Sequence, residues 1–205
     1  LSISSYNSGA TAATSHPVPI PTANVGDLVV IVYGQGATQN AITVPSGWTP
    51  VTAATNRAQA AWREIDGSEG STATFTQANA RIAAAIVYRY AAGTFDATSP
   101  VVGDFTTGST TPPASPSVTT GWGAVPVTWL LAYRTANTTS MPAAPAGYAS
   151  MQSEDIIVGA GTSLYLRSAD RELTAASESP GAWTATGTQS QPQAMLIAIQ
   201  GVACP

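Results

Sequence analysis

The segment GDLVVIVYGQ (26–35) carries an apolar run of six residues, LVVIVY (28–33), with Gly26 and Gly34 just outside it. Residues branched at Cβ favour extended backbone, and so short a run favours a strand over a helix. Because apolar and polar residues do not alternate, both faces of the strand must be covered by protein. The segment therefore predicts a layered β-fold with this strand near its centre.

The same kind of unit recurs one hundred residues further along the chain. PVTWLLAY (126–133) aligns with GDLVVIVY (26–33), and PAGY (145–148) aligns with PSGW (45–48). Both four-residue motifs have a proline, then a glycine, then an aromatic residue. Because a repeated sequence unit folds as a repeated structural unit, the match predicts two copies of one β-unit.

Two later segments extend the match in the same order. After an insertion of four residues, AWREID aligns with YLRSAD, which matches Arg63 with Arg167. The same alignment matches Asp66 with Asp170. After a longer insertion, IAAAIVYRY falls near AMLIAIQGV. We therefore expect an internal duplication, with a first β repeat over residues 1–92 and a second over 93–205.

The remaining patterns also favour strands. SLYLR (163–167) alternates, and the repeat favours a strand for AAWREI (60–65), which alone is also compatible with a helix. A strand is expected at 101–105, matching residues 2–6. Glycine and proline punctuate the chain, which predicts roughly ten to fourteen short strands in an all-β, jelly-roll-like antiparallel β-sandwich. The repeats either share one sandwich, which we favour, or form two in tandem.

Composition narrows the classes of partner. Charged residues make up 9% of the chain, against about 25% in an average soluble protein. The seven cations are all arginine, they form no cluster, and the net charge is −4, so no nucleic acid partner is expected. No run of eighteen apolar residues occurs, so no membrane insertion is expected. The single cysteine, Cys204, is interpreted as incidental.

The P-x-G-aromatic motif predicts a tight turn, because proline fixes φ and glycine two residues on permits positive φ. The aromatic residue then opens the next strand. Trp48 and Tyr148 are interpreted as equivalent core plugs, or alternatively as rings that stack on a sugar. Together with Trp62, one of five tryptophans, they are the candidate ligand-binding residues.

Two carboxylate clusters are candidate metal ligands. Asp66 and Glu69 lie in one predicted hairpin, and Asp170 and Glu172 lie in its counterpart. Carboxylate oxygens suit calcium, the one cofactor considered, although Asp and Glu at a hairpin also serve simply as turn residues. His16, the only histidine, has no nucleophile motif beside it and is interpreted as structural or surface-exposed. We therefore expect no catalytic residues and no enzyme.

The pattern GDLVVIVYGQGATQNAITVPSGWTPV resembles virion surface proteins encoded in phage genomes, which include head decoration or spike proteins, minor tail proteins and fibre tips. The resemblance is clearest over residues 26–52 and fainter over 126–151, where Pro126-Val127 replaces Gly-Asp and Tyr148 replaces Trp. It implies a non-enzymatic function and supplies no catalytic residues.

This resemblance predicts a virion surface protein, either a capsid decoration or a tail fibre component, of a tailed phage or phage-like particle. Its expected partners are other copies of itself in a homo-oligomer such as a trimer, capsid or tail proteins, and host surface glycans. A surface so poor in charge also favours burial of sheet edges against other subunits. The alternative hypothesis is a secreted, extracellular bacterial carbohydrate-binding or adhesion module, which an exposed row of tryptophans would favour.

Overall fold

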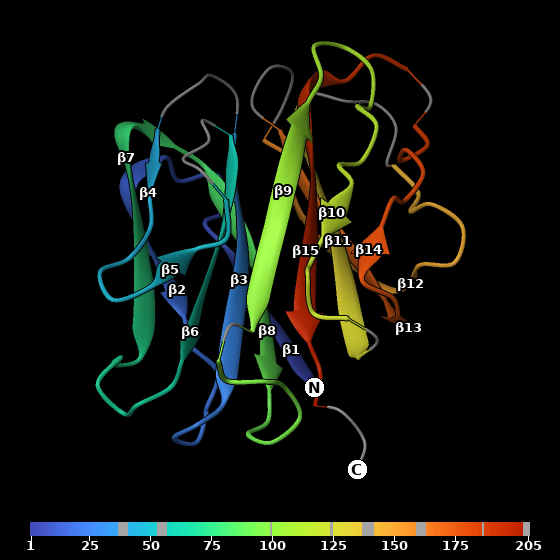
Figure 1. The fold of residues 1–205 in the computed structure, drawn as a ribbon. Helices are drawn as coiled ribbons and strands as arrows, with labels where there is room; N and C mark the ends of the chain where they lie inside the picture. The colour runs from blue at the N-terminus through green and yellow to red at the C-terminus, as the bar shows by residue number, and fades with distance from the viewer. Residues whose placement is uncertain are drawn as a thin grey trace.

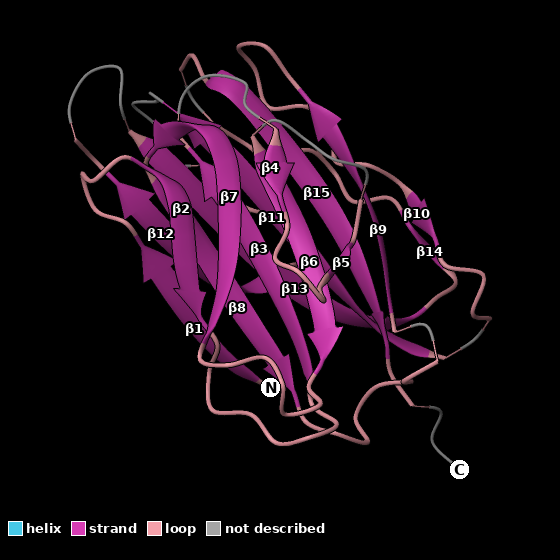
Figure 2. Ribbon diagram, turned by 90° about the vertical axis from the view of Figure 1, so that its left-hand side faces the viewer, coloured by secondary structure: helices cyan, strands magenta, loops and turns pink. Residues whose placement is uncertain are grey.

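The computed structural model describes residues 1–205 except 37–40, 53–56, 99, 124, 137–141, 159–162, 186 and 203–205, so the interpretation of Cys204 lies outside the described residues. The described chain forms strands and loops only (Figure 2). None of it forms a helix suited to crossing a membrane. The strands are β1 (Ser2–Asn7), β2 (Ala13–Pro19), β3 (Leu28–Gln35), β4 (Ile42–Thr43), β5 (Thr49–Pro50), β6 (Ala58–Glu64), β7 (Thr72–Arg81), β8 (Ala83–Tyr90), β9 (Val101–Thr107), β10 (Val118–Thr119), β11 (Pro126–Ala136), β12 (Ala149–Ile156), β13 (Leu164–Thr174), β14 (Ser177–Glu178) and β15 (Ser190–Gln200).

The apolar run LVVIVY forms most of β3, the middle strand of a five-stranded sheet with the order β1-β8-β3-β6-β5. Every residue of β3 is buried, as the lack of alternation predicted. Leu28, Val30 and Val32 point to one side of the sheet, and Val29, Ile31 and Tyr33 point to the other. The central strand is therefore buried between two separate hydrophobic cores.

A second five-stranded sheet has the order β12-β13-β11-β15-β9. Read from its other end, this order matches that of the first sheet strand for strand, with β11 in the place of β3 and β9 in the place of β1. Each of these sheets is covered on its outer face by a smaller one, of order β2-β7-β4 on the first and β10-β14 on the second. Every ladder joins strands of the same half of the chain, and the halves lie side by side (Figure 1).

Three cores hold these layers together. The inner core lies between the two five-stranded sheets and takes residues from both, for example Val30 and Ile86 from the first and Leu166 from the second. The first outer core includes Trp48 and Phe75. The second outer core lies on the far face of the second sheet. The molecule is therefore an all-β sandwich in which both halves contribute to a shared centre.

The strand predictions for AAWREI and SLYLR are confirmed, because AAWREI lies largely in β6 and SLYLR largely in β13. IAAAIVYRY, which the repeat match includes, lies largely in β8. The expected strand at 101–105 is β9. The strand number differs from the expectation, since the described residues form fifteen strands rather than ten to fourteen. The excess comes from strands of only two residues, which composition and punctuation do not reveal.

Candidate functional site

The PSGW motif forms the predicted tight turn. The amide of Trp48 donates to the carbonyl of Pro45 at 3.1 Å, and Gly47 has φ of 78°. Trp48 is only 7% exposed and packs in the first outer core. This burial supports the interpretation of Trp48 as a core plug over its interpretation as a ring that stacks on a sugar.

The PAGY motif repeats the turn in the second half. The amide of Tyr148 donates to the carbonyl of Pro145 at 3.3 Å, and Gly147 has φ of 86°. Tyr148 is half-buried against the second outer core, and the guanidinium carbon of Arg171 lies 4.8 Å from the centre of its ring. This distance permits a cation–π interaction, which occupies one ring face. Ligand binding by Tyr148 stays a prediction.

An arginine lies beneath the glycine of each turn. A Cβ on Gly47 would lie 2.6 Å from Nη1 of Arg63, and one on Gly147 would lie 3.0 Å from Nη1 of Arg171. In the ladders, Arg63 is opposite Val29, and Arg171 is opposite Trp129, its counterpart one hundred residues on. The predicted match of Arg63 with Arg167 is therefore wrong, and the insertion is eight residues rather than four.

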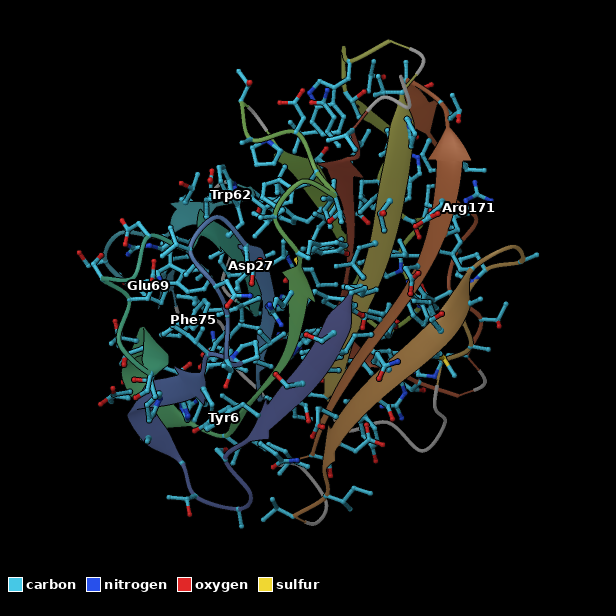
Figure 3. All side chains as sticks on the ribbon, turned by 90° about the horizontal axis from the view of Figure 1, so that it is seen from below. Tyr6, Asp27, Trp62, Glu69, Phe75 and Arg171 are labelled. Carbon is cyan, nitrogen blue, oxygen red and sulfur yellow. The ribbon has the colours of Figure 1, made fainter. Side chains whose placement is uncertain are left out.

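A buried glutamate completes each arrangement. Nε of Arg63 lies 3.1 Å from Oε1 of Glu69, and Arg171 pairs with Glu178. Both glutamates have side chains that are nearly buried. We name Gly47, Arg63 and Glu69 the first turn site. Gly147, Arg171 and Glu178 form the second turn site. Figure 3 shows Glu69 and Arg171 on opposite sides of the molecule, so the two sites do not form one cleft.

The first carboxylate cluster is used within its own hairpin. Glu69 accepts hydrogen bonds from the amides of Asp66 at 2.6 Å and Gly67 at 3.0 Å. The exposed Asp66 accepts from Nη2 of Arg63 at 2.9 Å and from the amide of Ser68 at 2.8 Å. The pKa of Asp66 is well below its usual range, chiefly because of the hydrogen bonds from Ser68. These contacts fit the interpretation of Asp66 and Glu69 as turn residues.

The second cluster lies on a different face. The counterpart of Asp66 is not Asp170, because Asp170 and Glu172 lie within β13 and face the first sheet rather than a hairpin. Asp170 is half-buried, and its pKa is raised by burial and by the charge of Glu172. Among the residues that the structure describes, no three His, Cys, Asp or Glu side chains are grouped to hold a metal ion. Calcium needs six to eight oxygen ligands, so neither pair alone forms its site.

The tryptophans do not form an exposed row. Trp62 is half-buried against the inner core, in the ladder opposite Val30. Trp129 and Trp183 are buried, and Trp122 is half-buried. Since all five tryptophans lie within the described residues, the surface feature that would favour a carbohydrate-binding module does not occur.

A pocket of about 290 Å³ adjoins the first turn site. Pro21 and Ile65 give it apolar walls, and Glu69 and Ser71 contribute polar groups. Its size is near the lower limit for small-molecule sites. A smaller pocket of about 110 Å³ adjoins Glu172 at one end of β11 and is lined by Thr94, Pro126, Val127, Thr128, Gly201 and Val202 as well. One predicted site residue therefore lines each pocket, Glu69 the larger and Glu172 the smaller.

Sequence reasoning missed the part played by Asp27. Its buried carboxylate accepts from the amides of Asn24 at 2.7 Å and Ala92 at 2.9 Å, and from Nε of Arg89 at 2.7 Å. Burial alone would raise the pKa of Asp27, but these bonds outweigh it and the pKa is lowered. The Gly-Asp pair before a buried strand was the available signal, because a charge there must be compensated.

His16 is buried, which agrees with a structural role. Its Nδ1 lies 3.2 Å from the hydroxyl of Tyr6, and its Nε2 lies 3.1 Å from the carbonyl of Ala13. Burial is the main cause of its lowered pKa.

The fold places the chain in the class of antiparallel β-sandwich proteins. Comparisons with protein-family models, with curated proteins and with solved structures gave no match.

Proposed function

We propose that this protein is a non-enzymatic surface component of a tailed phage or phage-like particle. In this proposal it docks on the capsid or tail as a homo-oligomer such as a trimer and exposes loops to host glycans. The observation that carries the proposal is an apolar edge in the second half. Met151, on the edge strand β12, is exposed, and so are Ile157 and Val158 directly after it.

Edge strands favour association because their outer backbone groups can pair with another chain. β12 pairs with β13 on one side and ends that sheet. Its exposed residues, Ala149, Ser150, Met151 and Ser153, are all uncharged. The half-buried Glu154 and the backbone carbonyl of Asp155, which follow at its C-terminal end, accept hydrogen bonds from Asn7 of β1, so the open part of the edge is the stretch around Met151. Proteins that stay monomeric commonly protect such edges with lysine, and this chain has none. The edge therefore supports burial against a second copy or a shell protein.

The turn sites support a display function. Each fixes a surface turn to a strand through a half-buried arginine paired with a nearly buried glutamate, so the turn is restrained. Many copies on one particle would then add weak contacts through high effective concentration. The pocket beside Glu69 is the place where we propose such a glycan contact.

Electron microscopy of particles with and without the protein tests its location. We expect density at the capsid or tail surface, and we expect this density to disappear when the gene is deleted. Sedimentation of the purified protein tests the edge: Met151→Arg should shift the oligomer toward monomer, whereas Leu1→Arg, an exposed apolar residue outside β12, should not. Absence of the protein from every virion would refute the proposal.

The alternative, a secreted carbohydrate-binding or adhesion module, has no specific observation in its favour here, since its tryptophans are buried or half-buried. Specific glycan-array binding by the isolated monomer would support it.

We also propose that the halves arose by duplication and that each follows jelly-roll connectivity. The matching strand orders of the two large sheets, and the equivalent positions of Arg63 and Arg171, support this. An experimental structure in which the halves follow different strand orders would contradict it.

A further inference from the structure

Arg134 is an unusual residue for the inner core. It lies on β11, on the same face as the buried Leu130 and Ala132, and it is itself 0% exposed. A charged group in such a place is costly unless an opposite charge or several hydrogen bonds compensate it. The partners of Arg134 therefore decide what this position does.

Two of its three nitrogens are bonded to neutral groups. Nε donates to the carbonyl of Gln35 at 2.7 Å, and Nη1 donates to the carbonyl of Gln191 at 3.0 Å. Nη2 is buried and has no hydrogen-bond partner in the described structure. Gln191 has φ of 50°, a strained value for a residue other than glycine, at an irregularity of the ladder. Two backbone carbonyls thus accept hydrogen bonds from the guanidinium, but none of the ion pairs in the described residues neutralises its charge.

A second arginine lies close enough for its positive charge to act on Arg134. Arg57, half-buried just before β6, donates through Nη1 to the carbonyl of Gly108 at 3.4 Å, and its Nε is buried without a partner. Burial, followed by the charge of Arg57, lowers the pKa of Arg134 to about 9. All eleven Asp and Glu side chains lie in the described residues, yet the five ion pairs found there include neither arginine.

Gln193 contributes a third unused donor. It is directly opposite Arg134 in the ladder between β11 and β15, so the two side chains lie on one face of the sheet. Its Oε1 accepts from the amide of Ala58 at 3.0 Å, while its Nε2 is buried without a partner. A Cβ on Gly34 would lie 3.2 Å from Cγ of Arg134, so glycine there lets β3 pack closely on the arginine.

We propose that Arg134, Arg57 and Gln193 together bind one small oxyanion between the two five-stranded sheets. The unused N–H groups of two guanidinium groups and one amide supply donors, and the anion supplies the missing negative charge. Arginine suits this role because its planar N–H groups match carboxylate and phosphate oxygens. Since the donors come from both halves, the bound anion stabilises their association. The inference does not depend on the proposed function.

Thermal unfolding of the whole protein in chloride buffer, titrated with inorganic phosphate at constant ionic strength, tests this site. A ligand that binds only the folded state raises Tm in a saturable manner. We expect such a rise at low-millimolar phosphate, and acetate in a parallel titration distinguishes a carboxylate preference from a phosphate preference. Arg57→Gln should weaken the apparent affinity by roughly ten- to a hundred-fold, because it removes a charge-assisted contact.

Arg81→Gln is the charge-matched control. Nη1 of Arg81 donates to the carbonyl of Ala80 at the surface, so this variant loses one positive charge elsewhere and should keep the wild-type response. If Arg134→Gln does not fold, Arg57→Gln still decides the question. If an anion remains bound through purification, ion chromatography after the protein is unfolded will detect its release. The proposal is overturned if no stoichiometric oxyanion is released and no saturable rise occurs, or if Arg57→Gln and wild type respond equally.

Discussion

Nη1 of Arg63 lies so close beneath Gly47 that a Cβ added to the glycine would stand 2.6 Å from it. The arginine cannot move freely, because Glu69 and Asp66 hold its guanidinium. The turn formed by PSGW and the hairpin after β6 are therefore coupled through Arg63, although more than a dozen residues separate them in sequence.

Gly47→Ala should lower the free energy of unfolding more than an ordinary substitution at positive φ. The backbone conformation alone costs about 1–2 kcal/mol. Displacing Arg63 from its carboxylates should bring the total to about 2–3 kcal/mol, within the range for disrupting a partly buried charged hydrogen bond. Urea unfolding measures the difference.

Gly121→Ala is the matched control for this experiment. Gly121 has φ of 74°, close to the 78° of Gly47, but no atom within 4 Å of an added Cβ. Its alanine variant should cost only the backbone term. Equal losses in the two variants would show that Arg63 exerts no constraint on the turn.

Local chemistry made the two turns predictable, whereas the arginines beneath them could not be predicted correctly. Proline and glycine act within four residues, so PSGW indicates its own conformation. The match of Arg63 with Arg171 depends on the length of the intervening hairpins, and an alignment of low identity placed the insertion wrongly. Arg134 stands next to an apolar run, and nothing in that run distinguishes an arginine that enters the core from one that points to solvent.

Asp27 should make folding sensitive to acid. Because its folded pKa lies below the unfolded value, its contribution to stability is fully present above about pH 4 and is lost as the pH falls through the folded pKa. Asp27→Asn should lower stability at neutral pH by about 1.5–3 kcal/mol and flatten the dependence of stability on pH below about pH 4. Denaturant unfolding at a series of pH values measures both effects.

The exposed Asp104, which accepts a hydrogen bond from the amide of Phe105, provides the comparison. Asp104→Asn should leave stability within about 0.5 kcal/mol of wild type, as expected of most surface changes. An Asp27→Asn protein with wild-type acid sensitivity would contradict the part assigned to this carboxylate.

The hydroxyls of Tyr88 and Ser168 form a hydrogen bond across the inner core, between the two halves of the chain. A double-mutant cycle with Tyr88→Phe and Ser168→Ala should give a coupling energy of about 0.5–1.5 kcal/mol. The exposed pair Ser117 and Ser179 is the control, and its alanine cycle should give a coupling near zero. Because the inner core is shared, every variant should unfold in a single transition, and separate transitions of the halves would contradict this.

Tyr90 should make the free energy of unfolding fall at alkaline pH, although its hydroxyl contributes no hydrogen bond at neutral pH. Its hydroxyl is buried and has no partner in the described structure. Burial raises its pKa, and the carboxylates of Asp170 and Glu172 add to the effect. The unfolded state therefore loses this proton near pH 10 while the folded state retains it, so the stability it provides is present below about pH 10 and lost above. Arg134 has the opposite effect on the pH dependence of stability, because its lowered pKa means that the folded state releases this proton before the unfolded state does.

The isosteric variant Tyr90→Phe isolates this effect, because Arg134 is unchanged in it. At pH 7 its stability should equal or exceed that of wild type, since a buried unpaired hydroxyl costs about 1–3 kcal/mol. Above about pH 10 its stability should fall less steeply, by up to about 1.4 kcal/mol per pH unit. Tyr88→Phe, which removes a bonded hydroxyl, should instead be less stable than wild type at pH 7. If the two variants lost equal stability at pH 7, the hydroxyl of Tyr90 would have a partner, and the assignment of an unpaired group would be wrong.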